Sequence, residues 1–166
     1  SAVYILQRGR IFVSQDDGFS FAPGLDVDTA ATAGDIVGSE AGGPTLYVAL
    51  RQSSGDWNLH RSDDAGQSSV FVRTLNSFWG STQSMAAFAH DASRLVYGGV
   101  EAWVSTDGGA SSSRINTWGS YYGDPANRLH ADIRGMSPLV DLDAPGEPDL
   151  LFINTDGGTY LTSDGG

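Results

Sequence analysis

Short apolar runs alternate with glycine-rich polar turns along the whole chain. No segment of a dozen residues repeats its apolar positions with the 3.6-residue period of an amphipathic helix. We therefore expect almost no helix and many short strands, as in an all-β fold. Pro23-Gly24 is a turn signal that should end the third strand. The predicted strands are 2–7, 11–13, 19–22, 35–38, 45–50, 57–60, 69–72, 85–89, 94–98, 102–104, 113–115, 130–136, 150–153 and 159–161.

An acidic turn with the pattern Ser/Thr-x-Asp-x-Gly follows four of these strands. In such a turn the Asp carboxylate accepts hydrogen bonds from backbone N–H groups two or three residues further on, and Gly supplies a positive φ. We interpret the turns as structural devices that hold hairpin corners. The residues that define the four copies are Ser14, Asp16 and Gly18; Ser62, Asp64 and Gly66; Ser105, Asp107 and Gly109; and Thr162, Asp164 and Gly166.

The acidic turns recur at intervals of roughly 40–60 residues, about the length of a four-stranded propeller blade. They divide a single predicted domain, 1–166, into approximate units 1–40, 41–80, 81–125 and 126–166. We therefore expect a β-propeller of four-stranded antiparallel blades. The first unit begins at the equivalent of a second strand, and the last unit ends before its final strand. The chain should thus contain about three and a half blades.

A propeller with an incomplete blade at each end has exposed sheet edges, which natural proteins avoid, and closed propellers usually have four to eight blades. The pattern therefore favours a larger ring of which this chain is a part, or a ring that a second copy or a further chain completes. A self-contained four-bladed ring is the alternative.

The formal net charge is −11, because 20 acidic residues stand against nine arginines and the chain has no lysine. Such a surface repels phosphate backbones, so nucleic acid is not an expected partner. Cysteine is absent, which excludes disulfides and zinc–thiolate sites. No apolar run reaches 18 residues, so we expect no insertion into a membrane.

The four acidic turns resemble the Asp-box, or BNR, repeat (S-x-D-x-G-x-T-W) of sialidases, sortilin-type domains and xyloglucanase-like propellers. From Val96 onward the chain looks like secreted bacterial sialidase-like propellers. The segments 96–109, 130–132 and 154–160 are the basis of this similarity. The resemblance implies a bacterial protein that is secreted or displayed on the cell surface. It also implies that the acidic turns lie at the blade periphery, away from a central ligand-binding face.

The resemblance leads to two hypotheses about function. The first is a non-catalytic propeller module that binds a glycan or a protein, or assembles with copies of itself. The alternative is a glycoside hydrolase of sialidase or xyloglucanase type, with this chain as part of the catalytic propeller. Sialidase chemistry would imply an arginine triad and a Tyr/Glu nucleophile pair. Xyloglucanase-type chemistry would need two facing Asp residues from different blades, and Asp132 is a candidate for one of them.

Polar residues alternate in the predicted strand 130–136. His130, Asp132 and Arg134 would project from one face of that strand. They form either a ligand-binding surface or a structural hydrogen-bond cluster. One His cannot by itself make a metal site.

Aromatic residues fall into two groups. Trp57 and Trp103 lie in predicted strands, so we expect them in the core between blades. Trp118, Tyr121 and Tyr122 lie in a Gly/Ser loop, where flat rings either stack on sugars or pack at a blade junction.

An acidic segment near the C-terminus resembles a calcium loop, in which carboxylates surround a Gly. Carboxylate oxygens suit Ca²⁺ better than a transition metal. The alternative is a solvated acidic loop, and no other cofactor is required. The candidate ligands are Asp141, Asp143, Glu147 and Asp149.

Overall fold

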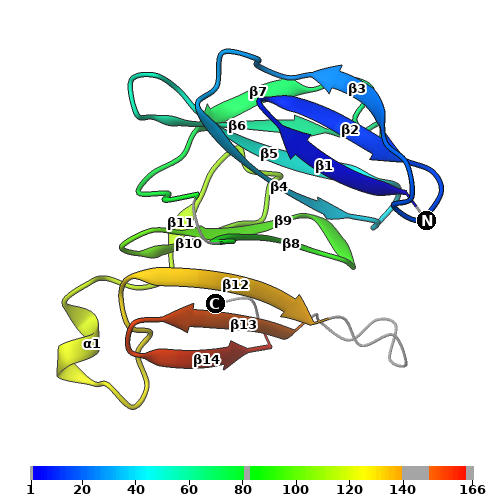
Figure 1. The fold of residues 1–166 in the computed structure, drawn as a ribbon. Coiled ribbons are helices and arrows are strands. Elements are labelled where there is room, and N and C mark those ends of the chain that lie inside the picture. The colour runs from blue at the N-terminus through cyan, green and yellow to red at the C-terminus, as the bar shows by residue number, and fades with distance from the viewer. Residues whose placement is uncertain (1, 81–82, 140–149, 164–166) are drawn as a thin grey trace.

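The fold consists almost entirely of antiparallel β-sheet. The computed structural model describes residues 2–80, 83–139 and 150–163. These residues form four sheets and one short helix, α1 (Ser120–Gly123) (Figure 1). The all-β prediction is therefore confirmed. No helix among the described residues is long and apolar enough to cross a membrane.

The first two sheets are built from the N-terminal half of the chain. The first has three strands and the second has four, and each strand pairs with the next one in sequence. The first sheet contains β1 (Val3–Gln7), β2 (Arg10–Ser14) and β3 (Ala22–Asp26); the second contains β4 (Ala33–Ser39), β5 (Thr45–Arg51), β6 (Trp57–Ser62) and β7 (Val70–Thr74).

The last two sheets repeat this arrangement with four and then three strands. The third sheet contains β8 (Met85–Phe88), β9 (Asp91–Gly98), β10 (Ala102–Ser105) and β11 (Ser113–Arg114); the fourth contains β12 (Ile133–Leu139), β13 (Leu150–Thr155) and β14 (Gly158–Thr162).

The first strands of neighbouring sheets lie side by side. β8 contacts β4 on one side and β12 on the other, and β1 also contacts β4. Figure 1 shows β4, β8 and β12 as three successive layers. β4, β8 and β12 therefore form the inner surface of the second, third and fourth sheets, and the later strands of these sheets lie progressively further out.

The two three-stranded sheets agree with the prediction that the chain begins at the equivalent of a second strand and ends before the final strand of its last sheet. In the complete sheets the acidic turn follows the third strand, β6 or β10. In the first sheet it follows β2, so the described part of that sheet has no equivalent of β4. In the last sheet the acidic-turn sequence begins at the end of β14, the third strand.

The apolar residues of the middle strands point alternately to two cores. In β5, Tyr47 and Ala49 pack against the third sheet, whereas Leu46, Val48 and Leu50 pack against the first. This is the two-residue period of a strand that is buried on both faces. β9 alternates in the same way, because its neighbouring residues belong to the core with the second sheet and to the core with the fourth.

The two tryptophans predicted in strands do lie at a junction between sheets. Trp57 is buried, and its ring meets Phe78 edge to face with centroids 5.0 Å apart. Trp103 packs on the same core and stacks on Tyr97 at 6.5 Å. This core fills the space between the second and third sheets.

The third strand does not end at Pro23, as the turn signal predicts. β3 runs from Ala22 to Asp26 and includes Pro23-Gly24. Proline lacks an N–H, so it is tolerated in a strand that lies at the edge of a sheet. β3 is such a strand, and its pairing with β2 shifts register between Arg10 and Phe12.

The predicted strand at 35–38 is longer than expected and belongs to the second sheet. β4 pairs with β5 over seven residues, from Ala33 opposite Arg51 to Ser39 opposite Thr45. The small and acidic residues around it obscured this strand in the sequence, although Ile36 and Val37 have high β-propensity.

Three acidic turns share one set of hydrogen bonds. The Ser105 hydroxyl donates to Asp107 Oδ1 (2.8 Å) and accepts the N–H of Gly109 (2.8 Å). The Asp107 carboxylate accepts the N–H and the hydroxyl of Ser111. The turns at Ser14 and Ser62 repeat these contacts. Asp164 and Gly166 of the fourth turn lie outside the described residues.

These hydrogen bonds lower the pKa values of the turn aspartates. Hydroxyl and backbone donors in the turn hold the pKa of Asp16, Asp64 and Asp107 at about 2. The carboxylates are satisfied within their own turns, which supports the structural role that the sequence predicts.

Candidate functional site

The loops of this fold lie at two opposite ends of the sheets. Because consecutive strands are antiparallel, the acidic turns after β2, β6 and β10 lie at one end. The connections between sheets and the turns between second and third strands of complete sheets lie at the other. α1 belongs to the connection from β11 to β12, so we call this second end the α1 end (Figure 1).

Four rings form a cluster at the α1 end. Tyr121 meets His130 edge to face at 4.5 Å, and Tyr122 contacts both Tyr121 (5.6 Å) and Trp118 (5.8 Å). Trp118 is 58% exposed and Tyr122 is 66% exposed. Four of the six predicted ligand-binding residues are therefore neighbours, and two of the rings present wide apolar surfaces to solvent.

Buried polar contacts hold the loop that contains these rings. The amide of Asn116 is buried; its Oδ1 accepts the N–H of Ala102 (2.7 Å), and its Nδ2 donates to the carbonyl of Leu129 (3.4 Å). Glu101 accepts the N–H of Trp118 (3.1 Å) and pairs with Arg114 (3.0 Å). The first part of the loop therefore bonds the third sheet directly, and the last part is linked to it through Asn116.

The turn between β13 and β14 connects the ring cluster to Arg134. Arg134 donates two hydrogen bonds to Asp156, at 2.6 and 3.0 Å, and its guanidinium lies 5.2 Å from the centre of the Trp79 ring. Hydrogen bonding to Arg134 lowers the pKa of Asp156. The next residue, Gly157, lies against the His130 ring, where an added Cβ would be 2.5 Å from Cγ.

The expectation that His130, Asp132 and Arg134 alternate along one strand is wrong. β12 begins only at Ile133, and Asp132 has a φ of 63°. The N–H groups of Asp132 and Ile133 instead bond the carbonyls of the turn before β10, at 2.9 and 2.8 Å. This left-handed residue breaks the alternation. The β13–β14 turn nevertheless contacts both His130 and Arg134.

A pocket of about 230 Å³ adjoins α1. It lies between the connection that contains α1 and the fourth sheet. Its lining combines polar groups, among them Asn127 and Arg128, with the aromatic ring of Tyr160. The recess beside α1 therefore contains hydrogen-bonding groups, and the four rings of the cluster are not part of its lining.

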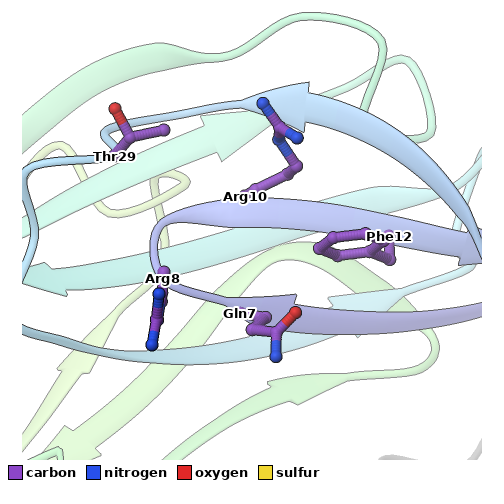
Figure 2. A pocket seen from close by; sticks show the side chains of 5 residues that line it. All are labelled: Gln7, Arg8, Arg10, Phe12 and Thr29. Atoms are coloured by element: carbon purple, nitrogen blue, oxygen red, sulfur yellow. The ribbon is translucent and has the colours of Figure 1, made fainter.

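A second pocket, of about 280 Å³, lies on the first sheet and contains two arginines, Arg8 and Arg10. Figure 2 shows their guanidinium groups pointing in different directions. Arg10 is hydrogen-bonded to Asp26 through both Nε and Nη2, so its charge is already paired. These two groups do not converge on a common ligand position.

A groove of about 470 Å³ lies along the inner strands β4, β8 and β12. The charged residue in its lining is Asp35, which the sequence analysis did not select. Burial raises the pKa of this carboxyl to about 6. A lone acidic residue beside the apolar pair Ile36-Val37 was the only sequence signal for this position.

No metal site is found in the part of the chain that the structure describes, because no three His, Asp or Glu side chains there lie close enough to hold an ion. The predicted calcium ligands Asp141, Asp143, Glu147 and Asp149 lie outside the described residues. The calcium loop remains a prediction.

Comparison with known proteins identifies the fold. No protein-family model matches the sequence, and no curated protein matches it. Among solved structures, the GH74 xyloglucanase from Xanthomonas campestris matches with a TM-score of 0.58 and 15% identity over 96% of this chain. The chain folds as part of a β-propeller. It spans 28% of the length of that enzyme.

Asp156 and Gly157 are the residues at the α1 end that sequence reasoning did not assign to the site. The run Asn154-Thr155-Asp156-Gly157-Gly158 is a clear turn signal. Nothing in the sequence pairs this turn with Arg134 or His130, because these contacts join segments more than 20 residues apart.

Proposed function

We propose that this chain is a non-catalytic propeller module that binds a neutral glycan at the α1 end. The observation that supports it most directly is the ring cluster, in which Trp118 and Tyr122 are more than half exposed. Flat apolar rings provide a surface on which the C–H face of a sugar can stack. Such rings with few polar neighbours are common in small-molecule sites.

The polar groups beside the rings suit sugar hydroxyls. Asp156 and Arg134 lie next to His130 through the β13–β14 turn. The charge of Arg134 is neutralised by Asp156, so it offers hydrogen bonds without a free positive charge. With a net charge of −11, the protein disfavours acidic polysaccharides. A neutral glycan fits these features better than an anionic one.

The similar solved structure suggests which neutral glycan to test. That protein is a xyloglucanase, so xyloglucan fragments are the first ligands to try. A titration with xyloglucan oligosaccharides, followed by calorimetry, should show binding by the wild-type protein and a loss of about tenfold or more in Trp118→Ala.

A matched control is available at the opposite end. Phe19 is 92% exposed and lies in the first acidic turn, so Phe19→Ala removes an exposed ring without changing the α1 end. The proposal requires this variant to bind like the wild type. Equal loss in both variants, or no binding of any neutral glycan by the wild type, would contradict it.

A glycoside hydrolase is the second candidate function. Two carboxylates, Asp132 and Asp156, both act on Arg134 and raise its pKa. Hydrolysis needs one carboxylate as base or nucleophile and one protonated acid. Asp156 suits only the first role, because Arg134 lowers its pKa. Release of reducing sugar from xyloglucan, abolished in Asp156→Asn, would establish this function in place of the non-catalytic one.

A further inference from the structure

The inner groove is separate from the ring cluster and has a different chemistry. β8 lies between β4 and β12 (Figure 1). The groove follows all three strands. Met85 and Met136 supply apolar surface, and Gln83 and Ser137 supply polar groups at its wall. Its volume of about 470 Å³ is within the usual range for small-molecule sites. Asp35 is the charged residue of the lining.

The carboxylate of Asp35 lacks most of its hydrogen bonds. Oδ1 accepts the N–H of Ile36 at 2.9 Å. Oδ2 is buried and has no hydrogen-bond partner among the described residues. An ionised carboxylate has about four acceptor positions. A buried charge with so few partners is unfavourable, and burial accordingly raises the pKa of Asp35 to about 6.

The strands packed around β4 do not compensate this charge. Ala49 of β5 lies opposite Asp35, and β8 contributes methionine and alanines. Burial and the Ile36 hydrogen bond account for the pKa of Asp35, without a neighbouring charge. The charged residues on the strands that contact β4, or that line the groove with it, are Arg51 on β5, Asp91 and Arg94 on β9, and Arg134 on β12.

Each of those charged residues has other contacts or is exposed, and none is hydrogen-bonded to Asp35 in the described part of the chain. Arg134 is paired with Asp156, and the guanidinium of Arg94 lies over the Phe88 ring at 4.9 Å. Asp91 bonds Ser93, and Arg51 is exposed at the end of β5, opposite Ala33. The groove therefore contains a desolvated carboxylate without a counter-ion from the described chain.

We propose that the inner groove is a second binding site, for a small ligand with a primary ammonium group such as an amino sugar, and that the Asp35 carboxylate is its counter-ion. An ammonium group offers both a positive charge and three hydrogen-bond donors, whereas a hydroxyl group offers one neutral donor. Only the charged group offsets the cost of keeping a carboxylate ionised in a half-buried site.

The site should respond to pH in one direction. The ammonium group favours the ionised form of Asp35, so its affinity is greatest at pH values above the pKa of Asp35 in the free protein, about 6, at which the ligand amine is still protonated. Affinity should fall as the pH decreases below that value, because binding must then remove a proton from the carboxyl group.

The test compares two sugars that differ in one group. Binding of glucosamine and of glucose is measured by ligand-observed NMR at pH 7.0 and pH 4.5. The proposal predicts that glucosamine binds at least tenfold more tightly than glucose at pH 7.0 and loses most of this preference at pH 4.5. Equal affinity for the two sugars at pH 7.0 would overturn it.

Two variants test whether the preference for glucosamine over glucose depends on Asp35. Asp35→Asn should abolish the preference for glucosamine, and Asp56→Asn, which changes an exposed carboxylate in the β5–β6 turn, should retain it. An unchanged preference in Asp35→Asn would also overturn the proposal. The wild-type comparison is decisive even if Asp35→Asn does not fold.

This site does not depend on the glycan site at the α1 end. Trp118→Ala should leave the preference for glucosamine unchanged. Failure of xyloglucan binding would contradict the proposed function alone, whereas failure of the amine preference would contradict the groove site alone.

Discussion

A single serine hydroxyl organises each of the three acidic turns that the structure describes. Ser105 is buried, and its Oγ serves as acceptor for Gly109 and as donor to Asp107. Removing it leaves a buried N–H without a partner and an aspartate with one hydrogen bond fewer. The turn is therefore sensitive to a very small change in the side chain.

We expect Ser105→Ala to lower the free energy of unfolding by about 1–2 kcal/mol, the usual cost of an unsatisfied buried donor. Urea unfolding followed by tryptophan fluorescence measures this. Ser113→Ala, an exposed change in β11, is the control and should be nearly neutral. Equal stability of the two variants would contradict the hydrogen-bond role of the turn.

Folding raises the pKa of Asp35, whereas it lowers the pKa of the turn aspartates. A rise in pH therefore changes the contributions of these two kinds of carboxyl group to stability in opposite directions. The pKa of Asp35 rises from 3.8 to about 6 on folding, so the folded state binds a proton more tightly than the unfolded state. The contribution of Asp35 to the free energy of unfolding therefore decreases as pH rises from about 4 to 6 and is constant above that range.

Asp35→Asn should remove this penalty. We expect the variant to be more stable than the wild type at pH 8, by about 1–3 kcal/mol, with the difference disappearing near pH 4. Thermal or urea unfolding at the two pH values measures it. A wild type that is more stable than the variant at pH 8 would show that Asp35 has an unrecognised partner.

At the scale of single elements, the close approach of the β13–β14 turn to His130 depends on Gly157. Gly157→Ala would place a Cβ at 2.5 Å from the His130 ring, so the turn or the ring must move. We expect a loss of about 1–3 kcal/mol in stability and weaker glycan binding. Gly119→Ala, in the same region of the fold with open space around it, is the control for both measurements. Unchanged stability and unchanged glycan binding in Gly157→Ala would show that the contact between Gly157 and His130 supports neither the fold nor the site.

The strands that could be predicted from the sequence are those with strong apolar patterns. β5 and β9 are apolar on both faces, and their positions follow directly from the sequence. β12 was placed three residues too early, because its first residue depends on contacts with another sheet. Asp132 turns at positive φ only because the backbone around it bonds the β9–β10 turn.

The candidate site was predictable only in part for the same reason. The loop aromatics Trp118, Tyr121 and Tyr122 stand out in the sequence, and the structure brings them together with His130. The pairing of Arg134 with Asp156 joins two strands across a sheet, and local patterns do not contain that information. The groove around Asp35 is lined by strands of three different sheets, so it could not be predicted without knowing how those sheets pack together.

At the scale of the whole molecule, the acidic turns and the proposed glycan site lie at opposite ends of the sheets. The acidic turns after β2, β6 and β10 satisfy their own carboxylates, whereas the proposed site lies beside α1 (Figure 1). The inner strands of neighbouring sheets provide a groove between the two ends. This separation allows ligands to bind at the α1 end without changing the turns that hold the sheets.

The central claim is that the α1 end is a glycan-binding surface, and amide and indole N–H chemical shifts test it most directly. Xyloglucan oligosaccharide is titrated into ¹⁵N-labelled protein. We predict shifts of the Trp118 indole N–H and of residues in 116–134 and 156–157, with residues of the acidic turns unchanged. Shifts concentrated in the acidic turns, or no shifts at millimolar ligand, would contradict the account.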